Sequence, residues 1–523
     1  MSDSTRPLFH NATLTDPQQV LEAVFGYRTF RPGQRHAIDS VMAGRDFIGV
    51  MPTGAGKSLT FQIPARLMNG AVLVLSPLIS LMKDQVDALV RLGFKAVMVN
   101  SSLSFEERRE RLAAFRRGEI ELLYLAPEAL EGSLRQFIAG CPVSLVVVDE
   151  AHCISQWGHE FRPAYRKLRG LKQELGDIPV LALTATATRK VVGDIIGQLG
   201  MRKPEGFKGS FFRSNLRITT VRKGEQTDAS GRKLPKREFR KDLLALLRTR
   251  RGESAIVYCL SRKSVEQTAD FLIDNGISAR PYHAGLSDEV RAKHQEMFAR
   301  DDVDVIVATV AFGMGIDKSN VRLVVHRDMP KSIEAWVQEI GRAGRDGLPS
   351  ECIVYYSWAD VIGYDHFLSD LDPALRQETR NKTEGLFNLL SSTRCRHQLA
   401  CLYFDETMAP CETSCDVCTG KGIESLVVVP TSFTASGRYR GAGAAKAELS
   451  DDALELFDRL KAVRKRLADA EGVPAYIVFG DAALAAMAER RPRTPDEFLA
   501  VPGVGQKKLE RYGEAFLEAL REA

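Results

Sequence analysis

Short apolar runs bounded by turn-forming residues recur along the N-terminal and middle parts of the chain. The clearest are Phe47–Val50, Ala71–Leu75, Leu145–Val148, Val180–Leu183, Ala255–Tyr258, Val303–Ala308 and Leu323–Val325. Amphipathic stretches with helical spacing, such as Leu81–Leu92 and Phe105–Arg116, alternate with them. This alternation is typical of βα units with buried parallel strands. Because it restarts near Ala255, after the poorly apolar stretch Lys223–Lys241, it predicts two consecutive α/β domains.

The C-terminal part of the chain has a helical pattern. A helical segment is predicted to about Cys418, and residues 420–446, rich in Gly, Ser, Thr and Ala, are predicted to form a linker. Apolar residues then return at helical spacing, at Leu454, Phe457, Leu460, Val463 and Leu467. The predicted segments are a tail at 1–20, α/β domains at 21–215 and 216–360, a helical subdomain at 361–419, the linker, and a small all-α domain at 447–523.

Composition, at 44% hydrophobic and 27% charged residues, is typical of soluble globular proteins. No apolar run approaches the ~20 residues of a membrane span. The first 16 residues are polar and lack a signal core, so we expect a cytoplasmic protein without membrane contact, nucleoid-associated in a bacterium. The net charge is +5, but residues 447–523 carry 12 basic and 15 acidic side chains. A phosphate-binding surface is therefore expected in the rest of the chain.

The sequence Met51-Pro-Thr-Gly-Ala-Gly-Lys-Ser58 follows an apolar run and opens a helical one. Such a loop offers backbone N–H groups to phosphate oxygens, while its Lys reaches the β- and γ-phosphates and its Ser ligates Mg²⁺. The strict pattern begins with Gly, where this chain has Met51. The loop predicts a site for ATP and Mg²⁺, and a fortuitous Gly-rich turn is the alternative. The expected binding residues are Thr53, Gly54, Gly56, Lys57 and Ser58.

Two carboxylates, Asp149 and Glu150, come directly after the apolar run Leu145–Val148. Acids in this position are costly unless a positive group meets them. We predict that Asp149 ligates Mg²⁺ and that Glu150 is the base that orients the attacking water. The alternative, in which Asp149 only caps a following helix, is disfavoured by the phosphate loop upstream.

The sequence Gln338-Glu-Ile-Gly-Arg-Ala-Gly-Arg345 lies in the second predicted α/β domain. A cation that reaches the γ-phosphate from another domain stabilises the charge of the transition state. Arg342 and Arg345, three residues apart, can face the same cleft from a turn or a helix start. We predict that both act in ATP hydrolysis, and a surface arginine pair is the alternative.

In this order, the motifs resemble superfamily 2 helicases and, within them, the RecQ family. Individually weaker matches to the family's motifs Ia, III, IV and V are Ser76–Gln85, Leu183–Ala187, Tyr258–Arg262 and Ala308–Asp317. The resemblance implies two RecA-like domains that clasp ATP in an ATP-dependent DNA helicase, acting in repair, recombination or replication. It implies 3′→5′ movement on single-stranded DNA and unwinding of tailed or forked duplexes. A monomer is expected.

Two further segments take their roles from this resemblance. The stretch Phe25–Gln34 is similar to the family's adenine-recognition motif, so Gln34 is expected to read the adenine edge, with Tyr27 and Arg31 framing the base. The stretch Cys153–Pro163, directly after the Asp-Glu-Ala-His box, is the most RecQ-like feature. Its aromatic residues could stack an unpaired base, worth ~1–3 kcal/mol. The residues expected to couple DNA binding to hydrolysis are Trp157, Phe161 and Arg162.

A cysteine cluster follows the second α/β domain. The spacing of Cys411, Cys415 and Cys418, together with Cys395, can supply four thiolates to a structural zinc ion. Cys401 is the rival fourth ligand. Cys395 is favoured because Arg394–Leu399 resembles the corresponding helix of the family, and a redox pair is the alternative for the cluster.

The segment after the zinc cluster departs from the family pattern. Full-length RecQ proteins continue into a winged-helix domain that wedges duplex DNA open, and residues 420–446 are too short for one. The tail resembles an HRDC domain through Val473–Phe479 and Leu499–Gly505. Its acidic balance disfavours strong autonomous DNA binding, so contact with DNA-repair proteins is an equal alternative. Rival functions are a DNA-stimulated translocase or a strand-annealing protein with weak unwinding, and an RNA helicase is disfavoured.

Overall fold

The computed structural model describes residues 14–77, 79–100, 103–155, 161–224, 237–310, 312, 318–367, 373–427 and 449–522. By their internal contacts, the residues form two compact units. The first unit contains Met1–Ser210 and Pro502–Lys507. The second contains Phe211–Val501 and Lys508–Ala523.

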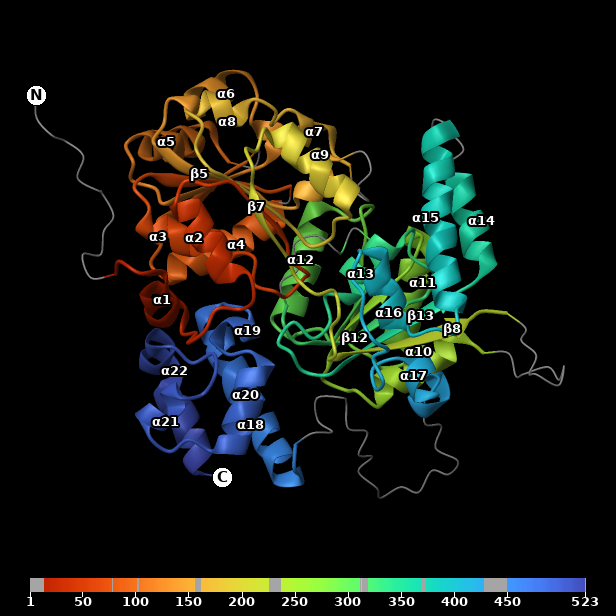
Figure 1. The fold of residues 1–523 in the computed structure, drawn as a ribbon. Coiled ribbons are helices and arrows are strands. Elements are labelled where there is room, and N and C mark those ends of the chain that lie inside the picture. Colours follow the sequence, from red (N-terminus) through yellow and green to blue (C-terminus); the bar gives the residue numbers. More distant parts are fainter. Residues whose placement is uncertain are drawn as a thin grey trace, which may run out of the picture. The chain divides into compact units, whose positions relative to one another are not determined.

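The first unit is built around a parallel sheet, whose strands are coloured red to yellow in Figure 1. The strand order is β3-β4-β2-β5-β6-β1-β7. Its strands are β1 Phe47–Val50, β2 Ala71–Leu75, β3 Ala96–Val99, β4 Leu122–Leu125, β5 Val143–Val148, β6 Val180–Thr184 and β7 Glu205–Lys208. Strands β1, β2, β4 and β6 are buried along their whole length, which is why they read as continuous apolar runs.

Two helices of the first α/β domain lie close to the predicted stretches Leu81–Leu92 and Phe105–Arg116. All helices of this domain lie before or between its strands in the chain. They are α1 Pro17–Val20, α2 Gln34–Met42, α3 Leu59–Leu67, α4 Ile79–Arg91, α5 Phe105–Arg116, α6 Gly132–Ala139, α7 Pro163–Arg166, α8 Leu171–Glu174 and α9 Arg189–Leu199. Helix α5 begins at a capping box between Ser104 and Glu107. Helix α4 buries Met82, Val86 and Leu89 in the core of the sheet.

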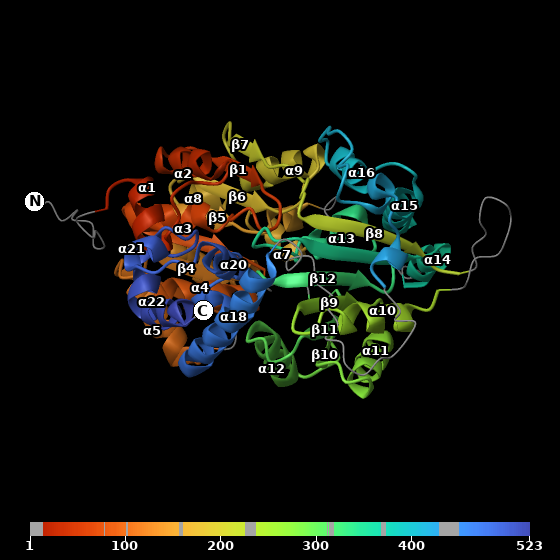
Figure 2. The same cartoon turned by 90° about the horizontal axis from the view of Figure 1, so that it is seen from below.

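The second unit contains a parallel sheet in the order β10-β11-β9-β12-β13-β8 (Figure 2). Its strands are β8 Leu216–Arg222, β9 Ser254–Tyr258, β10 Ala279–Tyr282, β11 Val305–Ala308, β12 Val321–His326 and β13 Ser350–Tyr356. Its helices are α10 Phe239–Arg248, α11 Arg262–Asp274, α12 Asp288–Ala299 and α13 Ile333–Ile340. The sheet begins before the predicted restart at Ala255, because β8 pairs with the distant β13.

A helical subdomain follows, with α14 Trp358–Phe367, α15 Pro373–Ser391, α16 Arg396–Tyr403 and α17 Asp416–Thr419. It is joined to β8 through Asp416, whose carboxylate accepts from Thr220 N at 2.9 Å and from Arg396 Nε at 3.0 Å. Of the predicted linker, residues 428–446 lie outside the described residues, whereas Ile423 packs in the core of the second sheet.

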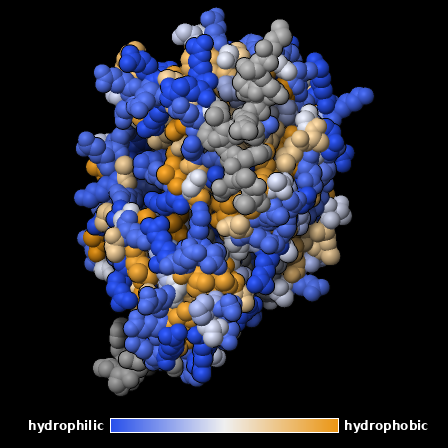
Figure 3. All heavy atoms as spheres, turned by 90° about the vertical axis from the view of Figure 1, so that its left-hand side faces the viewer, coloured by the Kyte–Doolittle hydropathy of each residue, from blue (hydrophilic) through white to orange (hydrophobic). Residues whose placement is uncertain are grey.

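The C-terminal helices are α18 Asp451–Glu471, α19 Ala475–Val478, α20 Asp481–Arg490, α21 Pro495–Leu499 and α22 Gln506–Arg521. Hydrophilic side chains surround the hydrophobic patches on the face drawn in Figure 3. In the part of the chain that the structure describes, no helix has the length and apolar composition needed to cross a membrane. Two tandem parallel α/β domains followed by helical ones confirm the predicted fold class.

Candidate functional site

The predicted phosphate loop connects β1 to α3. Gly54 and Gly56 have φ angles of 86° and 77°, a region that glycine adopts without strain. A Cβ at Gly56 would lie 2.5 Å from Gln34 Nε2, so this position also lacks room for a side chain. Backbone glycines therefore give the loop its tight path at the carboxyl end of a buried strand, where ligands bind in open parallel sheets.

Gln34 is 1% exposed and supports the phosphate loop directly. Its Oε1 accepts from the Arg31 backbone N–H at 2.8 Å, and its Nε2 donates to Gly56 O at 2.9 Å. The Arg31 guanidinium donates to Gly54 O. Tyr27, 46% exposed, belongs to the same predicted motif. The structure thus places Gln34 and Arg31 against the phosphate loop, although they come from a separate sequence motif.

The carboxylate of Asp149 is buried at the end of β5. Burial and the neighbouring Glu150 raise the pKa of Asp149 to about 7, and the Lys57 ammonium opposes this rise. Lys57 Nζ also donates to Met51 O at 3.1 Å. A nearby divalent cation would lower the pKa of such a buried carboxyl group and so stabilise its charged form. The Asp149 carboxylate and the Ser58 hydroxyl offer the kind of oxygen ligands that Mg²⁺ prefers, so these residues fit the ion.

Glu150 is linked to a motif elsewhere in the chain. Its Oε2 lies 3.3 Å from His152 Nδ1, and this nitrogen lies 2.9 Å from Thr184 Oγ1. Thr184 O in turn accepts from Met51 N at 2.9 Å. His152 and Thr184 thus connect the candidate base with β6 and the phosphate loop. Individual roles for these two residues were not predicted, although both lie inside recognised motifs.

The predicted DNA-coupling loop is described at its two ends, residues 153–155 and 161–163, and Trp157 lies outside the described residues. The Arg166 guanidinium lies 5.1 Å from the centre of the Phe161 ring. Arg162 N donates to Cys153 O at 2.9 Å, and its guanidinium donates to Pro77 O at 3.2 Å. Arg162 therefore ties the end of the loop both to the residues after the carboxylates and to the motif that follows β2.

Arg342 and Arg345 lie on the turn that follows α13 in the second unit. Arg342 is 5% exposed, which is unusual for a surface arginine. Burial raises the pKa of Tyr258, the last residue of β9, to about 12, and the charges of both arginines oppose this rise. The structure therefore places the two predicted arginines on one turn after α13, with Arg342 buried.

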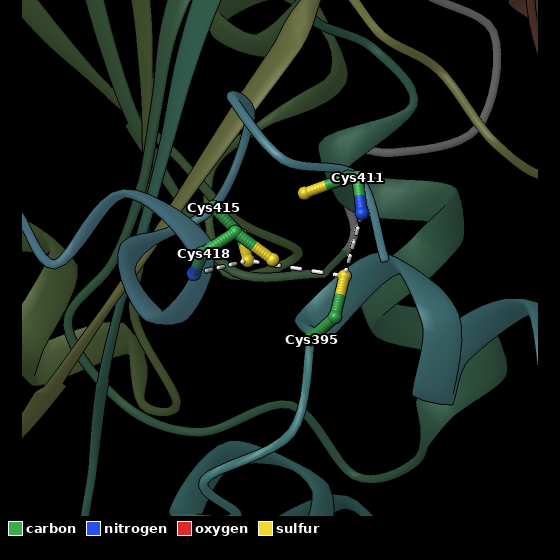
Figure 4. A group of neighbouring side chains, drawn as sticks. All are labelled: Cys395, Cys411, Cys415 and Cys418. Atoms are coloured by element: carbon green, nitrogen blue, oxygen red, sulfur yellow. Dashed lines mark hydrogen bonds between the residues drawn. The ribbon is translucent and has the colours of Figure 1, made fainter. Parts of the chain in front are cut away.

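The sulfur atoms of Cys395, Cys411, Cys415 and Cys418 all lie within 4.8 Å of one another, and Figure 4 shows the side chains pointing toward one another. The Cys395 and Cys415 sulfurs are 3.9 Å apart. Tetrahedral zinc with Zn–S bonds of about 2.3 Å requires sulfur separations near ~3.8 Å, so a modest contraction fits the ion. Cys401, although buried, is not a member of this group of described residues.

Four family models match the chain in the order in which the domains occur. They are DEAD/DEAH box helicase over residues 31–195, helicase conserved C-terminal domain over 238–347, RecQ zinc-binding over 358–419 and HRDC domain over 453–520. The third model includes the cysteine cluster in its C-terminal part and supports a zinc-binding domain there.

The chain is 36% identical to the ATP-dependent DNA helicase RecQ of Pasteurella multocida, over 98% of this chain and 95% of that protein. The chain belongs to the RecQ family of ATP-dependent DNA helicases. RecQ of Bacillus subtilis is also 36% identical, over 96% of this chain and 98% of its own length. The alignment with the Pasteurella multocida RecQ extends over 614 positions, whereas this chain has 523 residues. The alignment therefore contains many positions at which the relative has a residue and this chain has a gap.

Solved structures show the same fold at lower identity. Mycobacterium smegmatis helicase Lhr bound to single-stranded DNA and AMP-PNP has a TM-score of 0.51 at 21% identity, covering 70% of this RecQ chain and 56% of its own. Saccharomyces cerevisiae Dbp5 bound to RNA and ADP BeF3 has a TM-score of 0.54 at 14% identity, covering 72% of this chain and 100% of its own. The predicted RecQ resemblance is confirmed by the family models and the full-length relatives.

Proposed function

We propose that this RecQ protein unwinds duplex DNA while moving 3′→5′ on single-stranded DNA, and that it acts in DNA repair, recombination or replication. The observation that carries the proposal is the combination of a complete helicase core with the RecQ zinc-binding and HRDC domains in one chain. Single-stranded DNA and tailed or forked duplexes are the proposed partners, and DNA-repair proteins are proposed to bind through the HRDC domain. The protein is proposed to act as a monomer.

The phosphate loop, the carboxylates and the arginines are proposed to hydrolyse ATP. Lys57 binds the β- and γ-phosphates, Ser58 and Asp149 hold Mg²⁺, and Glu150 orients the attacking water. Mg²⁺ neutralises developing charge on the phosphates when it is bound. Arg342 and Arg345 stabilise the transition state. The remaining contacts to ATP are assigned to Tyr27, Arg31, Gln34, Thr53, Gly54 and Gly56.

The hydrogen bonds of Gln34 place its proposed adenine-reading amide at the phosphate loop. Its side-chain amide both accepts and donates within the phosphate-loop region, at Arg31 N and Gly56 O. An adenine edge offers the same pair of complementary groups. The Gln34 amide nitrogen donates to Ala55 O and Gly56 O, so reading an adenine edge would require it to exchange a bond to the loop for one to the base, which would couple the identity of the base to the path of the loop.

DNA is proposed to reach the hydrolytic site through Trp157, Phe161 and Arg162. The support for this route is that Arg162 donates hydrogen bonds to Cys153 O, which follows the carboxylate pair in the chain, and to Pro77 O, which follows β2. A base stacked on the loop would shift Arg162, and the change would reach Glu150 through the intervening residues. A stacking energy of ~1–3 kcal/mol per base is sufficient to shift the loop between two conformations.

Zinc is proposed to be structural, with Cys395, Cys411, Cys415 and Cys418 as its closed ligand set. The support comes from the hydrogen bonds that residues between the four cysteines make to strand β8. Ser414 O accepts from Ile218 N at 3.0 Å, and Asp416 accepts from Thr220, so the loop between the ligands is bonded to strand β8. Loss of the ion is expected to loosen the edge of the second sheet.

The decisive experiment measures ATP-dependent unwinding of 3′-tailed, 5′-tailed and blunt duplexes, with ATPase activity followed in parallel. Unwinding of the 3′-tailed substrate alone supports the proposal. It would also show that the short segment between residues 419 and 453, which separates the zinc and HRDC matches, suffices in place of a winged helix. Strong DNA-stimulated ATPase activity without unwinding of any substrate would contradict it.

A further inference from the structure

Two polar residues immediately before strand β8, Arg213 and Asn215, contact the turn that carries the arginine pair. They lie at the start of the second unit, far in sequence from that turn. Asn215 O accepts from Ser350 N at 2.9 Å, which anchors this segment at the beginning of β13. None of the recognised motifs includes either residue.

The side chains of Arg213 and Asn215 converge on three backbone carbonyls. Arg213 Nη1 donates to Gly341 O at 3.2 Å, and its Nη2 donates to Gly344 O. Asn215 Nδ2 donates to Gly344 O and to Leu348 O, each at 2.9 Å. The two side chains also contact each other, with Arg213 Nη2 at 3.4 Å from Asn215 Oδ1.

The turn needs such partners because of where it lies. Gly341 is the C-cap of α13, and the last carbonyls of a helix have no partner within the helix. Gly344 has a φ angle of 54°, and a Cβ there would meet Asn215 Nδ2 at 2.5 Å and Leu348 O at 2.7 Å. The chain therefore reverses direction around a glycine that sits directly against the Asn215 amide.

A second set of bonds holds the opposite side of the same turn. Gly344 N donates to Val321 O at 2.9 Å, and Arg322 Nη2 contacts Asp346 Oδ2 at 2.5 Å. The backbone is thus fixed on both sides of Arg342 and Arg345. A displacement of about 1 Å at a catalytic group can cost about 100-fold in rate. The position of this backbone therefore affects the rate of hydrolysis if Arg342 and Arg345 act on the transition state, whereas an ordinary surface turn affects only stability.

We propose that Arg213 and Asn215 are positioning residues for ATP hydrolysis, which hold the Gly341–Leu348 turn so that Arg342 and Arg345 reach the transition state. This inference rests on the proposed role of those two arginines. Arg213 and Asn215 touch neither the nucleotide nor the reacting atoms in this assignment. They act through the three carbonyls, so their loss lowers kcat and leaves ATP binding nearly unchanged.

The test compares Arg213→Gln, Arg213→Lys and Asn215→Ala in the full-length protein, with single-stranded DNA at saturation. We expect Arg213→Gln and Asn215→Ala to lower kcat about tenfold or more, with KM for ATP changing by less than about threefold. Arg213→Lys should recover part of the loss, since an ammonium can still reach one carbonyl. Melting temperatures are measured in parallel, and Asn215→Ala carries the test if Arg213→Gln does not fold.

The matched control is Asn275→Ala. Asn275 is the C-cap of α11, and its Nδ2 donates to Phe271 O at 2.8 Å, so it makes the same kind of bond away from the arginine turn. An equal loss of kcat in this variant would overturn the positioning role, because general loosening of the domain would then explain the effect.

A mutant cycle separates this inference from the proposed function. In a background with Arg342→Ala and Arg345→Ala, adding Arg213→Gln is expected to lower the remaining single-turnover rate by less than about twofold. The same factor in both backgrounds would overturn the inference. If Arg342→Ala with Arg345→Ala itself retained the full kcat, the proposed function of the arginines would fail instead.

Discussion

Arg464 of the HRDC domain places its guanidinium 3.5 Å from the carboxylate of Asp301, which precedes strand β11 of the second RecA-like domain. Arg464 also contacts Asp481 at 2.7 Å within the HRDC domain, and Asp301 contacts the buried Lys318. Lys318 directly follows Asp317, the last residue of the predicted motif V. The HRDC domain is thus joined to the helicase core by charged groups that lie next to a motor motif.

We predict that Arg464→Met lowers the free energy of unfolding by about 3 kcal/mol. The reason is that the substitution removes the guanidinium that pairs with the carboxylates of Asp301 and Asp481. Thermal unfolding together with limited proteolysis of the HRDC domain measures the effect. The control is Arg466→Met, since Arg466 is exposed on the same helix. Equal melting temperatures for the two variants would contradict a stabilising role of the Arg464 pairs.

The same cluster predicts a dependence of stability on pH. Burial alone would raise the pKa values of Asp301 and Asp481, but nearby cations outweigh it and lower both, Arg464 acting on each. A carboxylate with a lowered pKa stabilises the fold above its unfolded value of about 3.9, and this stabilisation is lost as the pH falls below that value. Urea unfolding between pH 7 and pH 3 should show this loss, and it should be smaller in Asp481→Asn.

Lys57→Ala is expected to lower DNA-stimulated ATPase activity by about 1000-fold and to abolish unwinding, because the phosphates lose their point charge. Strand annealing measured without ATP should persist in this variant. The matched control is Lys241→Ala, since the exposed Lys241 pairs with Glu238 at the start of α10, outside the helicase motifs. Unwinding that survives Lys57→Ala would exclude ATP hydrolysis at this loop as its energy source.

Trp157→Ala and Phe161→Ala are expected to leave basal ATPase activity within about twofold and to lose most of the stimulation by single-stranded DNA, because a stacking platform worth ~1–3 kcal/mol is removed. Steady-state ATPase assays across a DNA titration measure this. Phe105→Ala is the control, because Phe105 is a 78% exposed aromatic residue of the same unit. Full stimulation in both loop variants would refute the coupling role.

Zinc analysis tests the ligand set. Wild-type protein should bind one equivalent of zinc, Cys395→Ala should lose it, and Cys401→Ala should keep it, because Cys401 lies outside the sulfur cluster. Removal of zinc by a chelator should lower the melting temperature by several degrees. Retention of zinc by Cys395→Ala together with its loss from Cys401→Ala would reverse the assignment.

Local patterns in the sequence were sufficient for the fold class and for most of the elements. Strand β2 occupies the predicted run Ala71–Leu75, and helix α5 spans the predicted Phe105–Arg116. These elements could be predicted because burial on both faces gives continuous apolar runs, and because a capping box marks where a helix begins. The phosphate loop and the cysteine spacing were equally local, since each function needs residues at fixed short separations.

Other features required the tertiary structure, because they depend on residues that are distant in the chain. Strand β8 joins the second sheet through β13, and the amide of Gln34 supports Gly56 of another motif. Membership of Cys395 in the sulfur cluster, with Cys401 outside it, is a matter of distances between side chains. The bonds of Arg213 and Asn215 to the arginine turn span more than a hundred residues. A sequence motif specifies which chemistry is available, whereas only folding decides which distant groups meet it, because contacts between elements follow from packing and not from spacing along the chain.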